Sequence, residues 1–372
     1  MDALILSCST GGGHNAAGNA VQQELQRRGH HTEIWDPYEL VSSRLAEGIG
    51  NTYIKTAQKM PVLFGLIYLL GEGYRRLPFR SPVYFANRKI ARLLEKHLNE
   101  HPVDLIVMPH LFPAEVITYM KQHGMKVPKT VFIATDYTCI PFTEETDCDY
   151  YIIPDKELLT EFAGRGIPKE RLLPIGIPVS RLFLRAMTKE EAKRQLGLSI
   201  EKHYILISGG SIGAGDLEEA VRVVCGYLEQ KKEIACIVIC GNNDRLYHKL
   251  KKRAKNTEVL HVLKSTQKMY LYMKASDVFI SKPGGLSSTE AAVAGTTLIH
   301  ISPIPGCEFA NQKFFAKHHM CIPVGNIQKQ LIPAIIYARK QHVEAKMRSA
   351  QTRCVNRHAC EEICDWLESF VQ

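Results

Sequence analysis

The chain has 372 residues, of which 45% are hydrophobic and 23% charged, a composition typical of a globular protein long enough for two domains. Its 47 Lys and Arg against 38 Asp and Glu give a net charge of +9, which fits an anionic substrate, an anionic membrane surface or a nucleic acid. No uninterrupted apolar run reaches the roughly 18–20 residues of a membrane span. The 11 cysteines form no CxxC pair, and no basic region precedes the first apolar run, so we expect a cytoplasmic protein.

Short apolar segments alternate with helical ones through the first half of the chain. We expect strands at Ala3–Ser9, Thr32–Trp35, Asp104–Met108, Thr130–Ala134 and Tyr150–Ile153. This alternation predicts a parallel sheet with helices on both faces. Prolines and a glycine interrupt the pattern at 173–179, and we expect a hinge between two domains there.

The first apolar segment runs into Gly11-Gly12-Gly13-His14, after which an Ala-rich amphipathic helix begins. Glycines let the backbone approach a ligand closely, and the N–H groups of a helix start favour negative charge. The same helix dipole disfavours a protonated imidazole, so we expect His14 to stay neutral near pH 7 and to serve as a general base. The alternative is a glycine turn followed by a surface histidine.

One segment departs from the alternating pattern, at 62–89. It starts with a strongly apolar run and continues with interleaved aromatic and basic residues. That mixture suits a surface that dips into an anionic bilayer. A buried helix with a solvated basic flank explains it equally well. The chain contains no recognisable nucleic-acid-binding module, and we expect no nucleic-acid partner.

A second series of strands and helices follows the hinge. Strands are expected at Tyr204–Ser208, Ile234–Cys240, Glu258–His261, Asp277–Ser281 and Thr297–Ile301, alternating with helices at about Leu217–Glu229, Asn243–Arg253, Thr289–Ala294 and Phe309–His318. Both halves therefore indicate doubly wound α/β domains. We assign 1–178 to the first domain, 179–344 to the second, and 345–372 to a C-terminal helix, from about Ala345 to Phe370, that packs on either one.

Three loops of the second half carry candidate binding residues. The first, Ser208-Gly209-Gly210-Ser211, lacks the Gly-Lys-Ser/Thr ending of a nucleoside-triphosphatase loop, so ATP hydrolysis is not indicated. A dinucleotide-binding dehydrogenase is the rival interpretation of this glycine loop. Against it, the next strand ends at Cys240-Gly241-Asn242-Asn243, with no acid at its tip for a ribose.

The second loop is Lys282-Pro283-Gly284-Gly285-Leu286-Ser287-Ser288-Thr289-Glu290. A strand ends, the chain turns, and a helix starts with hydroxyl residues. Backbone N–H groups at 286–288 and these hydroxyls can hold a diphosphate, while Glu290 can accept hydrogen bonds from a ribose diol. The alternative is a capped helix in which Ser287 is the N-cap and Glu290 completes a capping box.

The third loop is Pro305-Gly306-Cys307-Glu308-Phe309-Ala310-Asn311. Glu308 and Asn311 stand three residues apart at a helix start, and therefore on one face. A carboxylate and an amide presented together are suited to sugar hydroxyls. A second capped helix start is the alternative.

Taken together, the glycine loop with His14, the KPGG-x-S/T-x-x-E-A run at 282–291 and the PG-x-E-x-x-N run at 305–311 resemble a known family. It is the monogalactosyldiacylglycerol synthase and processive diacylglycerol glucosyltransferase family, which is related to the lipid II-forming N-acetylglucosaminyltransferase. The resemblance covers nearly the whole chain, including Thr135-Asp136 and 176–179. It implies a GT-B fold, in which two doubly wound Rossmann-like α/β domains face a cleft.

Residue roles follow from this resemblance. On the acceptor side it implies His14 as the base, Gly12, Gly13 and His110 as acceptor contacts, and Asp136 as a group that orients the base or the acceptor. On the donor side it implies Glu290 at the uridine ribose, Glu308 and Asn311 at the hexose, and, around the diphosphate, Gly210, Ser211, Gly284, Gly285, Leu286, Ser287, Ser288 and Thr289. No metal or cofactor is implied. Asp147-Cys148-Asp149 matches a metal-binding DxD pattern, but it precedes a first-domain strand, away from the expected nucleotide loops.

We therefore expect an inverting transfer of a hexose from UDP-glucose or UDP-galactose to diacylglycerol, giving a β-glycosyl lipid at the inner face of the membrane. Cys307 stands where the family usually has glutamine, and a thiol offers little to sugar hydroxyls, so the donor hexose stays open. Alternatives are another lipid acceptor (ceramide or a polyprenyl-linked cell-wall precursor), a nonenzymatic UDP-sugar sensor and an NAD-dependent oxidoreductase.

Overall fold

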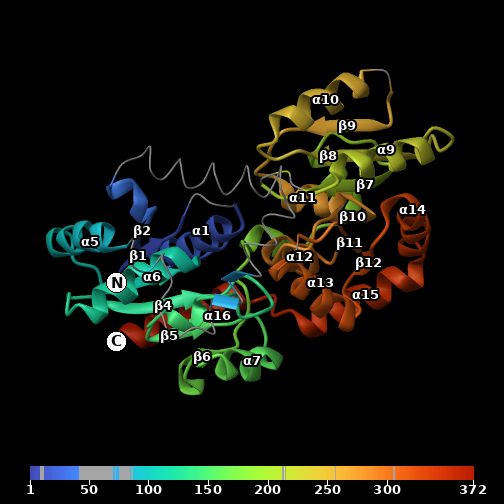
Figure 1. Cartoon of the computed structure of the whole chain (residues 1–372). Coiled ribbons are helices and arrows are strands. Elements are labelled where there is room, and N and C mark those ends of the chain that lie inside the picture. The colour runs from blue at the N-terminus through green and yellow to red at the C-terminus, as the bar shows by residue number, and fades with distance from the viewer. Residues whose placement is uncertain are drawn as a thin grey trace. The chain divides into compact units, whose positions relative to one another are not determined.

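The computed structural model describes residues 1–8, 12–41, 70–71, 73–74, 84, 87–211, 213, 215–255, 257–304 and 306–372. Two compact units make up the chain (Figure 1). Unit 1 contains Met1–Ser180, Pro305–Cys307 and Asn356–Gln372, and unit 2 contains Arg181–Ile304 and Glu308–Val355. Most of the segment at 62–89, where we predict a membrane-facing surface, lies outside the described residues.

Unit 1 is built on a six-stranded sheet in the order β2-β1-β3-β4-β5-β6, in which neighbouring strands are parallel. Its strands are β1 (Asp2–Leu6), β2 (His31–Trp35), β3 (Leu105–Met108), β4 (Lys129–Ile133), β5 (Tyr150–Ile152) and β6 (Leu172–Leu173). Its α-helices in the described ranges include α1 (Gly12–Arg27), α5 (Arg88–Glu100), α6 (Leu111–Gln122), α7 (Leu159–Gly164) and α16 (Ala359–Val371). The central strands are apolar on both faces, as parallel strands covered by helices must be.

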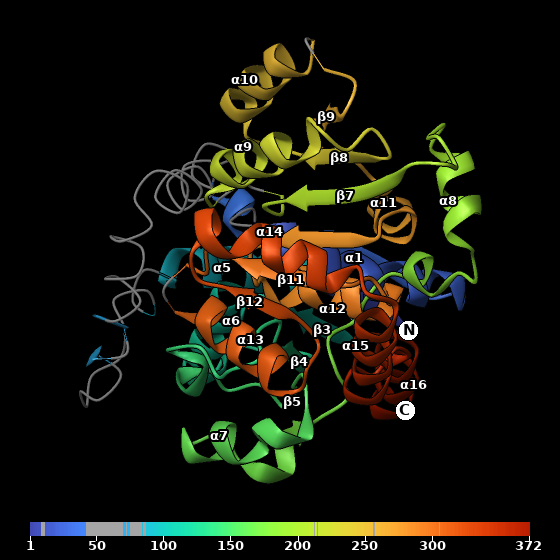
Figure 2. The same ribbon diagram turned by 90° about the vertical axis from the view of Figure 1, so that its right-hand side faces the viewer.

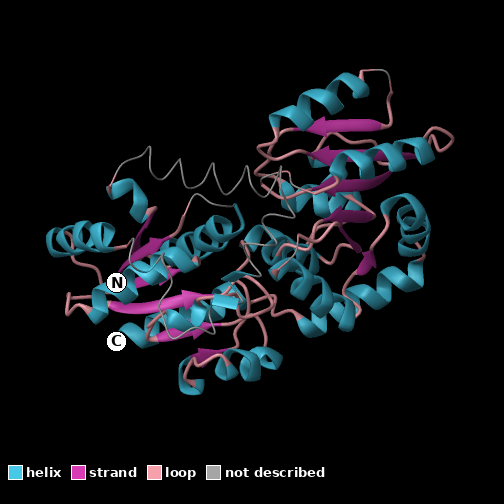
Figure 3. Ribbon diagram, in the orientation of Figure 1, coloured by secondary structure: helices cyan, strands magenta, loops and turns pink. Residues whose placement is uncertain are grey.

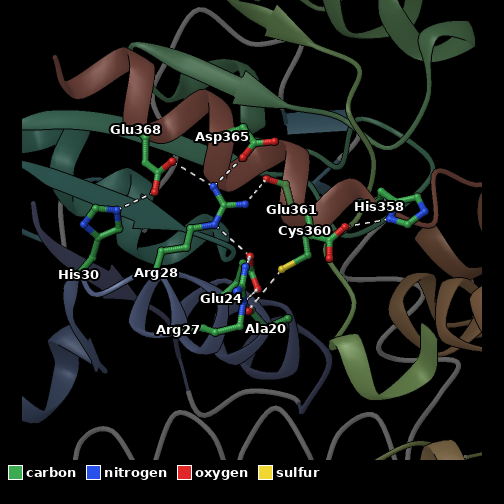
Figure 4. A network of polar contacts seen from close by, with 10 residues as sticks. All are labelled: Ala20, Glu24, Arg27, Arg28, His30, His358, Cys360, Glu361, Asp365 and Glu368. Atoms are coloured by element: carbon green, nitrogen blue, oxygen red, sulfur yellow. Dashed lines mark hydrogen bonds and ion pairs between the residues drawn. The ribbon is translucent and has the colours of Figure 1, made fainter. Parts of the chain in front are cut away.

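The C-terminal helix α16 packs against α1 and completes one face of this sheet. Ile363 and Leu367 of α16 join Val21 and Leu25 of α1 in one buried core. Figure 4 shows the polar network beside it, which is centred on Arg28. The Arg28 guanidinium donates to Glu24 of α1 and to Asp365, Glu368 and the Glu361 carbonyl of α16. Apolar burial and these ion pairs together attach a segment distant in sequence to the helix that begins near His14.

Unit 2 has its own six-stranded sheet, in the order β12-β11-β10-β7-β8-β9, again with parallel neighbours. The strands are β7 (His203–Ser208), β8 (Ile234–Ile239), β9 (Leu260–Leu263), β10 (Val278–Ser281), β11 (Leu298–Ile301) and β12 (Ile322–Val324). The described α-helices are α8 (Lys189–Gln195), α9 (Leu217–Leu228), α10 (Asp244–Ala254), α11 (Met269–Ala275), α12 (Gly285–Ala294), α13 (Cys307–Lys317), α14 (Ile327–Ala338) and α15 (Gln341–Cys354).

Successive strand residues of unit 2 face opposite sides of the sheet, and helices cover both sides (Figures 2 and 3). Val278 and Ile280 belong to the core formed with α9, α10 and α14. His300 lies on a strand whose neighbours in sequence, Ile299 and Ile301, belong to that same core, and its ring instead contacts Ser288 of α12. The fold class expected from the sequence, α/β with two doubly wound domains, is confirmed.

Helix boundaries differ from expectation at two places. The expected single helix from about 345 to 370 is two helices, α15 and α16, and the chain passes from unit 2 to unit 1 between them. At the break, the Asn356 side chain donates to the Ile175 carbonyl. The helix expected from Thr289 begins at Gly285 with Gly284 as its N-cap, so the interpretation of Ser287 as N-cap of a capping box is wrong.

Candidate functional site

Doubly wound sheets bind ligands at the carboxyl ends of their strands, where neighbouring strands are followed by helices on opposite faces. Unit 1 has this switch at β1 and β3, and unit 2 has it at β7 and β10, as the two strand orders require. The predicted residues follow these strands closely. His14 comes after β1, His110 after β3, Gly210 after β7 and Gly284 after β10.

His14 lies in the first turn of α1, partly buried, with a defined tautomer. Its Nδ1 is 2.9 Å from the Pro109 carbonyl oxygen and 2.8 Å from Thr135 Oγ1. Since a carbonyl oxygen only accepts, Nδ1 carries the proton in this contact and Nε2 keeps its lone pair. Burial lowers the pKa of His14, and the charge of Asp136 opposes that shift. The imidazole is therefore neutral at pH 7, with burial as the main cause.

His110 and Asp136 lie beside His14. The His110 ring meets the His14 ring edge to face, with 4.5 Å between the ring centres. His110 is buried as the N-cap of α6, where its Nδ1 accepts the Phe112 N–H, and burial holds the pKa of His110 well below its usual value. Asp136 and Thr135 line a small pocket with His14. Three strands thus bring these groups together, after β1, β3 and β4.

The remaining unit 1 candidates behave differently. Gly12 and Gly13 are the first residues of α1, and Gly13 is exposed. The residues just before them, 9–11, lie outside the described ranges. The carboxylates of the DxD pattern have other partners, since Asp147 pairs with Arg171 at 2.8 Å and Asp149 with Lys121 at 2.9 Å.

In unit 2, the N-terminus of α12 is built by glycine. Gly284 is its N-cap without a side-chain cap, which leaves the backbone N–H groups of the first turn uncovered by a capping side chain. Ser288 and Thr289 are buried and turned inward. The Ser288 hydroxyl lies 3.0 Å from His300 Nε2, and the Thr289 hydroxyl donates to the Gly285 carbonyl at 2.8 Å. Of the three hydroxyls at 287–289, only that of Ser287 belongs to a partly exposed residue.

Glu290 lies in the second turn of α12, and its carboxyl has a shifted pKa. Burial raises the pKa of Glu290 to about 8, so its carboxyl is mostly protonated at pH 7. No hydrogen-bond or ion-pair partner of this carboxyl occurs among the described residues. A partly buried carboxyl without a protein partner is suited to a polar ligand group such as a diol.

Glu308 and Asn311 join their loop to the loop before α12. Glu308 Oε1 pairs with Lys282 Nζ, and Oε2 accepts the Ile304 N–H at 2.9 Å. Asn311 donates from Nδ2 to the Pro283 carbonyl at 3.0 Å. Both residues are buried, at 6% and 0% exposure of the whole residue. The sequence places them on one helix face, and the structure adds that both already have protein partners.

The glycine loop after β7 is held in a conformation that only glycine permits. Gly213 has φ +58°, and a Cβ there would lie 2.1 Å from the Cys240 carbonyl oxygen. Gly210 also has a positive φ, and a Cβ there would lie in ordinary van der Waals contact with Lys282, 3.7 Å from its Cε. The loops after β7 and β10 are thus in contact, with Gly210 and Ser211 in the first.

Four residues at these sites have no role predicted from the sequence: Pro109, Thr135, His300 and Lys282. The Pro109 carbonyl gives no sequence signal, because backbone contacts across 95 residues leave none. Thr135 precedes the predicted Asp136, so its position at a strand end was the available signal. Lys282 lies within the KPGG-x-S/T-x-x-E-A run, but no local pattern indicates that it pairs with Glu308, 26 residues away.

Two findings concern the described residues as a whole. Within these ranges, none of the helices is both long and apolar enough to cross a bilayer. In the same part of the chain, no group of three or more His, Cys, Asp or Glu residues is arranged to share a metal ion.

Comparison with family models gives two matches that together span most of the chain. The model described as monogalactosyldiacylglycerol (MGDG) synthase matches residues 14–179. The model described as glycosyltransferase family 28 C-terminal domain matches residues 204–359. The first match begins at His14, and the second includes all three loops of unit 2.

Curated relatives are similar over comparable lengths. The processive diacylglycerol beta-glucosyltransferase of Bacillus licheniformis is 27% identical over 334 residues, which cover 88% of this chain and 84% of that protein. The protein of the same name from Bacillus subtilis is 26% identical over the same shares. That from Staphylococcus saprophyticus is 31% identical over 238 residues, covering 62% and 57%.

Solved structures share the fold at low identity. MurG of Acinetobacter baumannii superposes with a TM-score of 0.63 and 14% identity, covering 99% of each chain. The UDP-GlcNAc 2-epimerase of Neisseria meningitidis, solved with UDP-GlcNAc, gives a TM-score of 0.60 and 11% identity over 99% of this chain and all of that one. The expected GT-B fold is confirmed. An epimerase among these neighbours shows that the fold by itself does not select the reaction.

Proposed function

We propose that this chain, which belongs to the glycosyltransferases that join an MGDG synthase domain to a glycosyltransferase family 28 C-terminal domain, transfers a hexose from a UDP-sugar to diacylglycerol. The relatives named diacylglycerol beta-glucosyltransferases support this acceptor, and their coverage extends over both units. The single observation that carries the proposal is His14, a neutral imidazole with Nδ1 held by a backbone carbonyl and Nε2 left as an acceptor.

In the proposed mechanism, His14 Nε2 removes the proton from the acceptor hydroxyl. That oxygen attacks the anomeric carbon of the hexose and forms the new glycosidic bond. The bond from the anomeric carbon to the diphosphate oxygen breaks with its electron pair, and UDP leaves. Attack from the face opposite the leaving group inverts the configuration, so an α-linked UDP-hexose gives a β-glycosyl lipid.

The leaving diphosphate gains negative charge as this bond breaks. The first-turn N–H groups of α12, from Gly285 to Ser287, are the proposed stabilising groups, because a helix N-terminus favours an anion. Glu290 is proposed to hold the uridine ribose, since its carboxyl lacks a described protein partner. Asp136 is proposed to favour the imidazolium that forms on His14, because its charge raises the pKa of that ring. These steps use no metal ion or organic cofactor.

We place the reaction at the cytoplasmic face of an anionic membrane, to which the protein binds peripherally. Diacylglycerol resides in bilayers, and the net charge of +9 favours a surface of anionic lipids. The donor is UDP-glucose or UDP-galactose.

The proposal is tested with vesicles of phosphatidylcholine and phosphatidylglycerol that contain diacylglycerol. The full chain is incubated with UDP-glucose, UDP-galactose or UDP-N-acetylglucosamine, and the lipids are analysed by mass spectrometry. We expect a hexosyl diacylglycerol with one of the two hexose donors. Parallel vesicles carry ceramide in place of diacylglycerol. Product only on ceramide would reassign the acceptor, and the absence of any glycosylated lipid with all three donors would overturn the proposal.

A further inference from the structure

A buried ion pair joins two of the unit 2 loops. Lys282, at the end of β10, pairs with Glu308 in the first turn of α13. The lysine side chain is 15% exposed and the glutamate side chain 8%. Removing charges from water is costly unless they are paired, so each of these groups needs a partner of opposite charge or strong hydrogen bonds.

In this arrangement each carboxylate oxygen of Glu308 has one protein partner. Lys282 occupies Oε1, and the Ile304 N–H, at 2.9 Å, occupies Oε2. The resemblance to the glycosyltransferase family nevertheless implies that this carboxylate contacts the donor hexose. Each oxygen has a second lone pair, but this largely buried carboxylate gains full access to a hexose hydroxyl where one of the two partners withdraws. The backbone N–H is part of the loop, whereas the lysine is a flexible side chain.

Lys282 also lies next to the proposed diphosphate groups. Only Pro283 and Gly284 separate it from the first residue of α12. Its side chain passes beside Gly210, with Cε 3.7 Å from where a Cβ would stand. The Lys282 side chain therefore lies beside the loop after β7, and its backbone is close in sequence to the N-terminus of α12. A diphosphate at that helix end brings negative charge toward buried Glu308, which a cation must offset.

We propose that Lys282 exchanges partners when the donor binds, leaving Glu308 for the diphosphate and thereby freeing Glu308 Oε1 for a hexose hydroxyl. This inference rests on the proposed function, because it assumes that unit 2 binds a UDP-sugar. Lys282 is then a donor-binding residue, and it links recognition of the diphosphate to recognition of the hexose. UDP, which carries no sugar, draws Lys282 to the diphosphate but supplies no hexose hydroxyl to Glu308 Oε1.

The first test is binding of uridine, UDP and UDP-glucose to Lys282→Met, measured by isothermal titration calorimetry with the full chain. We expect the affinity for UDP to fall about tenfold or more, as for loss of one charge-assisted hydrogen bond. Uridine has no phosphate, so its affinity should stay within about twofold of the wild type. Lys282→Arg keeps a cation and should recover part of the UDP affinity. A lysine that only supports the loops predicts equal losses for uridine and UDP. A lysine that only neutralises Glu308 predicts wild-type affinity for UDP when Lys282→Met is combined with Glu308→Gln. Either result would overturn the exchange.

Glu308→Gln tests the other half of the exchange. The variant removes the carboxylate that competes for Lys282, so UDP should bind several-fold more tightly than to the wild type. Any advantage of UDP-glucose over UDP should shrink at the same time, because the hexose loses its carboxylate. Weaker binding of UDP to Glu308→Gln would contradict the competition between Glu308 and the diphosphate.

Lys189→Met is the matched control. Lys189 pairs with the largely buried Asp277 at 2.6 Å in the same unit, and Asp277 directly precedes β10, at the strand end opposite to Lys282. This variant should keep wild-type affinity for UDP although it too breaks a partly buried ion pair. If the wild type itself bound neither UDP nor UDP-glucose, the proposed function would fail. If the wild type bound UDP and Lys282→Met bound it equally well, only the exchange would fail.

Discussion

The two units share one architecture and use it for different chemistry. Each has a six-stranded parallel sheet whose candidate residues follow the strands at the switch in strand order. In unit 1 the result is a set of two histidines, one hydroxyl and one carboxylate, with burial lowering the pKa of both histidines. In unit 2 it is a glycine-capped helix start, a carboxyl with a raised pKa and a buried ion pair.

The difference shows that topology fixes where a ligand binds but not what happens to it. In unit 1 a backbone carbonyl orients a ring, which is what proton transfer requires. In unit 2 backbone N–H groups and paired charges are available, which is what anion binding requires. We therefore expect variants of unit 1 to change the rate of transfer and variants of unit 2 to change donor binding.

The largest expected effect is that of His14→Ala. Loss of a general base typically lowers kcat by about 10²–10⁴, and the affinity for UDP should not change because the nucleotide is assigned to unit 2. Transfer to diacylglycerol vesicles and calorimetric binding of UDP measure the two quantities. His123→Ala, a histidine stacked on Tyr119 in the same unit, is the control. Undiminished transfer by His14→Ala would remove the base assignment.

Gly213→Ala should disrupt unit 2 through its backbone. The new Cβ would lie 2.1 Å from the Cys240 carbonyl oxygen, at a residue with φ +58°. Overpacking and left-handed strain together should lower the free energy of unfolding by about 3 kcal/mol or more. Urea unfolding measures this loss.

Gly226→Ala is the comparison for that variant. Gly226 is exposed within α9, and a Cβ there meets no atom within 4 Å. Alanine favours a helix over glycine by about 1 kcal/mol, so this change should leave the protein equally stable or more stable. Equal destabilisation by both substitutions would contradict the role given to the Gly213 conformation.

Glu290→Gln should weaken UDP binding and stabilise the unliganded protein at alkaline pH. Burial raises the pKa of Glu290 to about 8 in the folded state, whereas the unfolded state has the ordinary glutamate pKa of about 4.3. Between these two pH values the folded state holds a proton that the unfolded state has already released. Stability therefore falls as pH rises through this window, and glutamine removes that dependence. Thermal unfolding at pH 5 and pH 8.5 should show a higher Tm for the variant only at pH 8.5.

Glu258→Gln, at an exposed position of the same unit, provides the reference for that comparison. It should change neither the Tm difference between the two pH values nor the affinity for UDP. A Glu290→Gln variant that behaved like Glu258→Gln would show that the Glu290 carboxyl is neither strained by burial nor used by the nucleotide.

The smallest expected effect is a change of pH profile in Asp136→Asn. The Asp136 charge raises the pKa of His14, so its removal should lower that pKa further. Since the neutral ring is the base, the acid limb of the kcat/KM profile of Asp136→Asn should move to lower pH. In the wild type this limb already lies below the ordinary pKa of histidine, because burial lowers the pKa of His14. Asp147→Asn, which breaks the pair with Arg171, is the control. A shift to higher pH in Asp136→Asn would contradict the assigned electrostatics.

Local sequence signals predicted most of the strands near the sites. Tyr204–Ser208 and Asp277–Ser281 differ from β7 and β10 by one residue at one end. The misses have physical reasons. The strands β6 and β12 have only two and three residues, and α14 contains Pro333, so none of them gives a strong periodic signal. The break between α15 and α16 contains no glycine or proline, and Asn356 forms a tertiary hydrogen bond there instead.

The two doubly wound domains, the loops that carry the site and the residue types in them follow from the sequence, because strand periodicity, glycine turns and helix starts are local properties. Which atoms of those residues already have partners depends on the tertiary structure. The Pro109 carbonyl fixes the tautomer of His14, although the two residues are 95 positions apart in the sequence. Lys282 forms an ion pair with Glu308, which is 26 positions away. Such pairings arise when separate strands of a parallel sheet end at one edge, and no local pattern encodes them.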